Sequence, residues 1–300
     1  MGANPLAAPR APAFRCVAVL GVGLIGGSFA ATLRARGLAG EVVGFTPGDD
    51  ACIARDLGHL DGVAASVAQA VAGADLVVLA TPVPAMPAVL AEARAAMADD
   101  ALITDCASTK QSVIAAARAA LGPAFARFVP GHPIAGSERH GPDAARADLF
   151  DGCVAVVCRL ADTDPAAFDR VHALWAAMGA RPTELDPARH DAVFAEVSHW
   201  PHAVAFALCG AIAGGPNADD ALRFAGAGLR DTTRIGASSP DLWADILLDN
   251  RAAVLDCARA FQAELAEVLT AIEQGDRAAL RVRLEAASRW RASLGPARRR

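Results

Sequence analysis

The chain has 300 residues, a length that suits one large or two ordinary domains. Hydrophobic residues make up 54% of the sequence, enough for a substantial core, and the formal net charge of −5 argues against nucleic acid as the main partner. No apolar run approaches the roughly 20 residues that span a bilayer, so we expect a cytoplasmic protein that does not bind membranes.

In the first half of the chain, short apolar runs alternate with helical stretches. The runs that predict strands are residues 16–20, 41–45, 74–80, 101–104, 128–129, 154–158 and 181–185. Helices are predicted at 24–36, 84–97 and 109–121, and around Trp175. The run at 74–80, ADLVVLA, is largely apolar, which is typical of a strand buried on both faces. The alternation predicts an α/β domain with a doubly wound, mostly parallel sheet.

Beyond Asp186 the pattern changes to helical periodicity, with almost no strand signal. Helices are predicted near 189–213, 217–227, 240–272 and 276–292, and Pro201 is expected to disturb the first of them. The prediction therefore divides the chain into a disordered leader (1–14), an α/β domain (15–187), an all-helical domain (188–294) and a frayed tail (295–300).

The seven cysteines are scattered along the chain and form no CxxC pair. This distribution favours free thiols in a reducing compartment over disulfides or a zinc site. The sequence shows no metal-ligand spacing, so no metal is predicted.

A glycine-rich turn, GVGLIG, joins the first predicted strand to the first predicted helix. It places Gly21, Gly23 and Gly26 in the G-x-G-x-x-G spacing, with Leu24 and Ile25 at the helix start. Glycine at these positions permits a tight turn, a close approach of pyrophosphate, and packing of the helix against the strand. The exposed N–H groups of the helix start then bind the anion. We predict a Rossmann-like dinucleotide site that also includes Thr81 and Pro82, which follow the 74–80 strand.

The residue expected to bind the adenine ribose is unusual. In most NAD sites an acidic side chain ends the second strand, about 20 residues after the glycines. That position is Thr46 here, which neither binds both ribose hydroxyls as a carboxylate does nor repels a 2′-phosphate. No arginine stands beside it, so the sequence leaves both NAD and NADP open.

Three polar segments follow predicted strands or interrupt the helical half. TDCASTK contains Ser108, and GHPIAGSE contains His132, each after a strand of the sheet. The third segment, GLRDTTRIGASSPDLW, runs from Gly228 to Trp243. Open α/β sheets bind their ligands at the carboxyl ends of the strands, so the first two segments are expected beside the cofactor.

With these motifs the sequence resembles the prephenate/arogenate dehydrogenase family of tyrosine biosynthesis. The resemblance rests on GVGLIGGS, TDCASTK, GHPIAGSE, SHWPHAVAFAL and RDTTRIGASSPDLW, and covers residues 15 to 290. It implies the NAD- or NADP-dependent oxidative decarboxylation of prephenate to 4-hydroxyphenylpyruvate. It also implies a small-molecule substrate and a homodimer built through the helical domain.

The chemistry of that reaction indicates which side chains act. A base must accept the proton of the ring hydroxyl, and histidine has a suitable pKa near neutrality, so His132 is the predicted base. Ser108 is predicted to hydrogen-bond the same hydroxyl or to orient the imidazole. A substrate with two carboxylates calls for a guanidinium, and the resemblance assigns this role to Arg234. The resemblance also implies substrate contacts for His202 and Ser137, and the remaining predicted substrate-binding residues are Glu138 and Trp243.

Several alternatives stay open at this stage. Ser137 and Glu138 could instead cap a helix, Trp243 could be a core aromatic, and the roles of His190, His199 and Arg230 are not assigned. Arogenate, alone or together with prephenate, is the alternative substrate. A different β-hydroxyacid or imine reductase, or a catalytically silent nucleotide-binding regulator, would also explain the glycine turn. Neither would need Ser108, His132 and Arg234 together. No separate regulatory domain is expected, so tyrosine feedback would act at the active site or the dimer interface.

Overall fold

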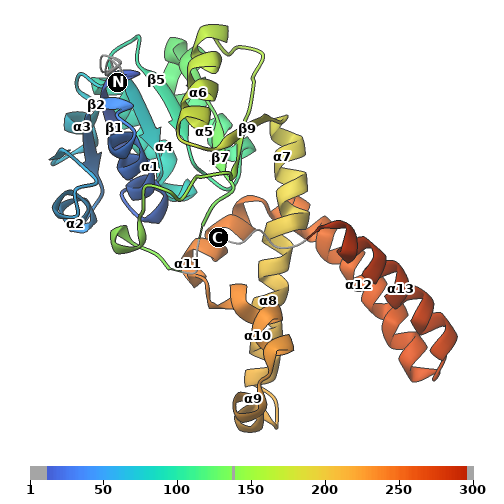
Figure 1. The fold of residues 1–300 in the computed structure, drawn as a ribbon. Coiled ribbons are helices and arrows are strands. Elements are labelled where there is room, and N and C mark those ends of the chain that lie inside the picture. The colour runs from blue at the N-terminus through green and yellow to red at the C-terminus, as the bar shows by residue number, and fades with distance from the viewer. Residues whose placement is uncertain (1–11, 137–138, 296–300) are drawn as a thin grey trace, which may run out of the picture. The chain divides into compact units, whose positions relative to one another are not determined.

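Six parallel strands form the main sheet of the computed structural model, which describes residues 12–136 and 139–295 (Figure 1). Their order is β3-β2-β1-β4-β5-β6. The strands are β1 (Phe14–Leu20), β2 (Ala39–Phe45), β3 (Gly62–Val63), β4 (Leu76–Leu79), β5 (Leu102–Asp105) and β6 (Phe128–Val129). The order reverses direction at β1 and β4, so the carboxyl ends of these two strands border the crevice where such sheets bind ligands. The predicted fold class is confirmed.

The central strand alternates between two cores. Val17 and Val19 of β1 pack in the cluster that contains Phe29 and Trp175, whereas Ala18 and Leu20 pack in the cluster on the opposite face. Both faces are covered by helices, namely α1 (Leu24–Ala35), α2 (Asp50–Asp56), α3 (Val67–Val71), α4 (Met86–Ala96), α5 (Gln111–Leu121) and α6 (Pro165–Ala177). Burial on both faces explains why these strands are apolar at successive positions rather than at alternate ones.

A second, smaller sheet differs from the prediction. Strands β7 (Gly131–Pro133), β8 (Val154–Val157) and β9 (Arg181–Glu184) form a separate three-stranded sheet, in which β7 runs antiparallel to β8. The last two of these strands were predicted to belong to the main sheet, and this prediction was wrong. Pro130 separates β6 from β7 and, because it has no N–H, cannot continue a ladder. The chain therefore leaves the main sheet just before His132.

The helical part of the first unit begins with a distorted helix. Helix α7 (Pro187–Phe194) is followed by a π-helical turn, η4 (Ala195–His199), and by α8 (Trp200–Ala213). The N–H of Trp200 bonds to the carbonyl oxygen of Ala195, five residues back. The predicted disturbance at Pro201 is therefore a widened turn. Helices α9 (Ala218–Phe224), α10 (Ala227–Thr233) and α11 (Pro240–Asp249) follow, with the short helical segment η5 (Arg234–Ala237) between the last two. Earlier in the chain, the α/β part contains three short helical segments, η1 (Val83–Ala85), η2 (Gly122–Arg127) and η3 (Pro142–Ala144).

The predicted helix 240–272 is in fact two helices, and the division of the chain into two compact units falls between them. The first unit extends to Asn250 and the second begins at Arg251. The second unit consists of α12 (Arg251–Glu273) and α13 (Arg277–Ser293), joined by a turn in which Gly275 has a φ of +64°. Arg283 of α13 pairs with Glu264 and Glu267 of α12. Within residues 12–136 and 139–295, no helix combines the length and the apolar character that a bilayer crossing requires.

Candidate active site

The glycine turn between β1 and α1 has the geometry that a dinucleotide needs. Gly21 has a φ of +92°, and a Cβ on it would lie 2.5 Å from the carbonyl oxygen of Ala80. A Cβ on Gly26 would overlap the carbonyl oxygen of Gly21, so only glycine lets α1 start this close to β1. Around the place where a Cβ on Gly23 would be, no described residue other than its chain neighbours has an atom within 4 Å. This leaves room for a pyrophosphate at the helix start.

The other predicted cofactor-binding residues lie at the same edge of the sheet. Leu24 and Ile25 are half-buried in the first turn of α1, which carries no acidic residue. Thr46 is half-buried directly after β2. Thr81 and the exposed Pro82 follow β4, and the buried hydroxyl oxygen of Thr81 has no hydrogen-bond partner among the described residues. An edge with open N–H groups, a buried hydroxyl and no carboxylate in the helix start fits an anionic dinucleotide.

A buried ion pair holds the loop that carries Ser108. Lys110 Nζ pairs with the carboxylate of Asp105, and both side chains are fully buried. Lys110 Nζ also donates to the carbonyl oxygen of Gly131 at 2.7 Å, while Asp105 accepts the N–H of Gly131 at 3.1 Å. The pair therefore ties the Ser108 loop to the residue that precedes His132. Ser108 itself is half-buried.

His132 is half-buried in β7 and begins a chain of hydrogen bonds. Its Nδ1 lies 2.8 Å from His190 Nε2, and His190 Nδ1 lies 2.8 Å from Asp191 Oδ1. The carboxylate of Asp191 also accepts the N–H of Lys110 at 2.8 Å and the N–H of Gln111 at 3.0 Å. Side chains from β7 and α7 thus meet at the start of α5.

The charges in this cluster follow from burial and hydrogen bonding. Burial lowers the pKa of His132 well below its ordinary value, and neighbouring His190 and Lys110 lower it further. Burial also lowers the pKa of His190, although its bond to Asp191 opposes this. Burial raises the pKa of Asp191, but the hydrogen bonds from His190, Gln111 and Lys110 outweigh it and the net shift is downward. At neutral pH a neutral His132 is therefore linked, through His190, to a charged carboxylate.

Asn250 and His199 form the next layer of the cluster. Asn250 Nδ2 donates to the backbone carbonyl oxygen of Asp191 at 2.8 Å and to His199 Nδ1 at 3.0 Å. His199 is 1% exposed, and burial lowers its pKa to about 4. These bonds use the side chain of the residue that follows α11. They place His199, whose role the sequence left open, beside the hydrogen-bonded chain His132–His190–Asp191, the His132 relay.

We expect His199 to make stability depend on pH. Because its folded-state pKa lies below the ordinary 6.5, the unfolded chain binds a proton that the folded chain does not. This contribution to stability is fully present above pH 6.5 and is lost as the pH falls toward 4. From this group alone, the free energy of unfolding should fall by about 2 kcal/mol between pH 7.5 and 5.

Urea unfolding of the wild type and of His199→Gln at the two pH values would measure this effect. The variant should lose about 2 kcal/mol less than the wild type, because glutamine keeps an acceptor for Asn250 but does not titrate. The same substitution at the exposed His140 serves as the control. An equal loss in all three proteins would contradict the prediction.

Three of the predicted substrate-binding residues lie together in the helical part. The rings of His202 and Trp243 are stacked, with centroids 3.4 Å apart and planes 16° from parallel. His202 Nδ1 donates to the carbonyl oxygen of Ser198 at 2.8 Å. Burial lowers the pKa of His202, and the positive charge of the exposed Arg234 lowers it further. The ring of His199 lies 6.2 Å from that of Trp243 and so links this group to the His132 relay.

Ser137, Glu138 and Arg230 are the remaining residues that the sequence singled out near the substrate. Ser137 and Glu138 lie outside the described residues. Arg230 is exposed on α10, one turn before Arg234. The described part of the chain contains no group of three or more histidine, cysteine, aspartate or glutamate residues arranged to hold a metal ion.

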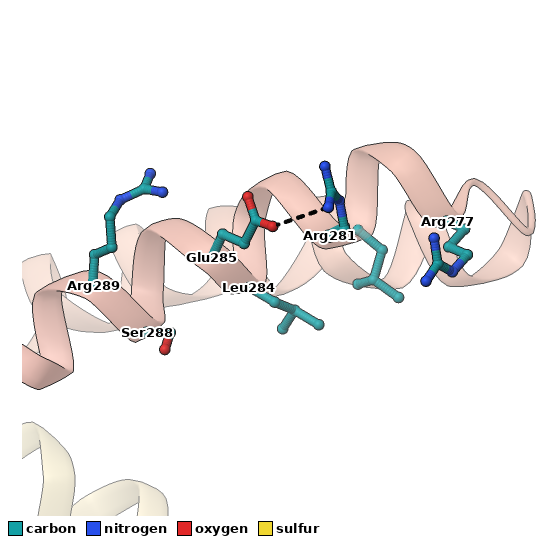
Figure 2. A pocket seen from close by; sticks show the side chains of 7 residues that line it. Arg277, Arg281, Leu284, Glu285, Ser288 and Arg289 are labelled. Carbon is teal, nitrogen blue, oxygen red and sulfur yellow. Dashed lines mark ion pairs between the residues drawn. The ribbon is translucent and has the colours of Figure 1, made fainter.

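A groove elsewhere in the chain is unrelated to these residues. It runs along α13 of the second unit and is lined by that helix alone (Figure 2). Its lining includes the ion pair of Arg281 with Glu285, at 3.4 Å, and the exposed Leu284. None of the predicted site residues contributes to it. An open surface groove along one helix lacks the converging polar groups that an active site needs.

Comparison with known proteins agrees with this arrangement. A family model described as the nucleotide-binding domain of prephenate dehydrogenase matches residues 29–184, and the model of its dimerization domain matches residues 186–286. The chain belongs to the prephenate dehydrogenase family. The predicted family is thus confirmed, and with it the prediction that the protein is an oxidoreductase.

Individual members of the prephenate dehydrogenase family match over most of their length. Prephenate dehydrogenase of Bacillus subtilis is 36% identical over 87% of this chain and 71% of its own length. Cyclohexadienyl dehydrogenase of Zymomonas mobilis is 35% identical over 88% of this chain and 90% of its own. The crystal structure of prephenate dehydrogenase from A. aeolicus, in complex with hydroxyphenyl propionate and NAD+, superposes with a TM-score of 0.86. It is 31% identical and covers 93% of this chain and 98% of that one.

Asp105, Lys110, Asp191 and Asn250 were not among the site residues predicted from the sequence. One signal was available for the first two, because TDCASTK places a lysine and an aspartate five residues apart beside a buried strand. Such charges need partners, and each could be the other's. Nothing in the local sequence links Asn250 to His199, because 51 residues separate them.

Proposed function

We propose that this chain catalyses the NAD(P)-dependent oxidative decarboxylation of prephenate to 4-hydroxyphenylpyruvate in tyrosine biosynthesis. The observation that carries the proposal is a neutral, half-buried histidine, His132, just beyond the main sheet whose carboxyl edge holds the glycine turn. Family membership and the names of the Bacillus subtilis and Zymomonas mobilis relatives support the substrate class.

In the proposed reaction, His132 accepts a proton. The substrate is a cyclohexadienol whose ring carries a hydroxyl group opposite a carboxylate. When bound, the nicotinamide cofactor supplies the acceptor for the hydride that leaves the hydroxyl-bearing carbon. His132 takes the hydroxyl proton as the carbonyl character develops, and Ser108 hydrogen-bonds the same oxygen or orients the imidazole. The ring carboxylate then departs as CO2, and its bonding electrons make the ring aromatic and leave a negative charge on the former hydroxyl oxygen. That oxygen takes the proton back from His132, which gives the hydroxyl group of 4-hydroxyphenylpyruvate. Aromatisation drives the loss of CO2, so no further group is needed for it.

The residues that we propose for substrate binding are Arg234, His202 and Trp243, together with Ser137 and Glu138. A guanidinium can bind a carboxylate through two parallel hydrogen bonds, which suits Arg234. The stack of His202 on Trp243 supplies a flat apolar surface with a polar edge for the ring. Gly21, Gly23, Leu24, Ile25, Gly26, Thr46, Thr81, Pro82 and Ser108 are the proposed cofactor-binding residues.

Replacing Arg234 with glutamine should raise the KM for substrate by about 10- to 100-fold, because a charged hydrogen-bonding partner of a carboxylate is lost. The affinity for the cofactor should stay nearly unchanged. Steady-state kinetics and cofactor titration would measure both quantities, with the exposed Arg223→Gln of α9 as the matched control. A loss confined to cofactor affinity would show that the substrate does not bind at Arg234.

One assay tests the proposed function together with its open choices. Turnover of prephenate and of arogenate is measured, each with NAD and with NADP. Activity with prephenate supports the proposal. Activity with arogenate, alone or in addition, would instead identify an arogenate or dual-specificity cyclohexadienyl dehydrogenase, as the Zymomonas mobilis relative is named. No turnover with any pair would favour the silent nucleotide-binding regulator.

We also propose a homodimer formed through the helical domain, with the domains at 15–187 and 188–294. The second unit exposes an apolar stripe on α12, at Phe261, Leu265, Leu269 and Ile272. These residues recur at helical spacing on one face, and such exposed apolar faces commonly mark interfaces between chains. The match to a dimerization domain over residues 186–286 supports the same proposal.

A further inference from the structure

The hydrogen-bonded chain that ends at His132 has a direction. Asp191 lies 2.8 Å from His190 Nδ1, and a carboxylate can only accept, so this nitrogen of His190 carries the proton. In a neutral imidazole the other nitrogen is then an acceptor. His190 Nε2 must therefore accept from His132 Nδ1, at 2.8 Å. His132 Nε2 is left with its lone pair, the form that a proton acceptor needs.

The charged end of the chain is held by donors alone. The backbone N–H groups of Lys110 and Gln111 and the side-chain amide of Gln111 all donate to Asp191, at 2.8, 3.0 and 3.2 Å. With His190, the carboxylate therefore faces four donors. If Asp191 were protonated, its O–H group would face one of these N–H donors in a buried site, which is unfavourable. The direction of the chain is thus determined by the start of α5, far in sequence from α7.

We propose that Asp191 and His190 are positioning residues that hold His132 in the tautomer whose Nε2 accepts the substrate proton. The inference rests on the proposed function, in which His132 is the base. The same chain stabilises the imidazolium that forms, because His190 accepts from it and the charge of Asp191 lies one ring away. Lys110 is the other charged group beside the relay, and its ammonium is paired with Asp105.

Replacing Asp191 with asparagine should reverse the chain. The amide can donate to His190 Nδ1, which moves the proton of His190 to Nε2 and that of His132 also to Nε2. We expect kcat to fall by roughly 10²- to 10⁴-fold while the KM for substrate changes by less than about threefold. Long-range 1H–15N NMR spectra of the full-length protein with 15N-labelled histidine report which nitrogen of His132 is protonated, with His132→Asn identifying its signals.

Two substitutions at His190 keep the test independent of the bonds that Asp191 makes to α5. His190→Phe preserves the ring but removes the acceptor, so kcat should fall by a similar factor. His190→Gln offers an amide oxygen to His132 Nδ1 and should recover at least about tenfold of that loss. A role in packing alone predicts the opposite order, since phenylalanine is the closer match in shape.

The results of these experiments distinguish a failure of the proposed relay from a failure of the proposed function. A wild-type protein with normal turnover whose His132 carries its proton on Nε2 would overturn the relay and leave the proposed function intact. Equal kcat in the wild type and in His190→Phe would do the same. A wild-type protein without turnover on prephenate or arogenate would overturn both. Wild-type His132 protonated on Nδ1, with the predicted order of the His190 variants, would establish the relay.

Discussion

Replacing His132 with asparagine should lower kcat by about 10²- to 10⁴-fold, the usual contribution of a general base. Asparagine retains a polar side chain near the position of the imidazole, but its amide does not accept a proton near neutral pH. Substrate KM and cofactor affinity should change by less than about threefold, because binding depends on other residues. Steady-state kinetics with prephenate, together with a cofactor titration, would measure the three quantities.

The matched control for this substitution lies eight residues further on. His140 is exposed and has no proposed role, so His140→Asn should leave kcat unchanged. Near-normal turnover in His132→Asn would remove His132 as the base. A loss of cofactor binding in that variant would show that the substitution disturbs the loop held by Lys110 rather than the chemistry.

Replacing Lys110 with methionine should lower the free energy of unfolding by about 3–5 kcal/mol, the typical penalty for removing one partner of a buried ion pair. Methionine fills much of the same volume, so the loss comes from charge. Asp105 would keep a buried negative charge without its ammonium, and the carbonyl oxygen of Gly131 would lose a donor. Urea or thermal unfolding at pH 7.5 would measure the loss at a common protein concentration.

Two further variants test the reason for that loss. Arg55→Met breaks a surface pair with Asp56 and should cost far less than Lys110→Met, because water screens exposed charges. Adding Asp105→Asn to Lys110→Met removes the uncompensated charge and should recover part of the stability. If Lys110→Met cost no more than Arg55→Met, the buried pair would not be what holds the Ser108 loop in place.

The parts of the fold that depend on near neighbours in sequence were predictable. The glycine turn was recognisable because its three glycines lie close together in one strand–turn–helix unit, although the atom that a Cβ on Gly21 would meet belongs to Ala80, beyond β4. Apolar runs marked five of the six strands of the main sheet, whereas the two-residue β3 (Gly62–Val63) was not predicted. Pro201 marked the distorted turn before α8. In contrast, the break in the predicted helix 240–272 was not predictable. It falls at Asn250, between α11 and α12, and the side chain of this residue bonds to distant partners, His199 and the backbone of Asp191.

In the candidate site, too, the features that depend on local sequence were predictable and the contacts between distant residues were not. The sequence by itself determined the family, the α/β architecture and the residue types at the strand ends, since each depends on local spacing that a motif displays. Only the tertiary structure decided that His132 leaves the main sheet, that His190 and Asp191 reach it from α7, and that Asp105 and Lys110 bury their charges beneath it. Hydrogen bonds and ion pairs between distant residues depend on how helices and strands pack, and packing brings together residues that no local pattern connects.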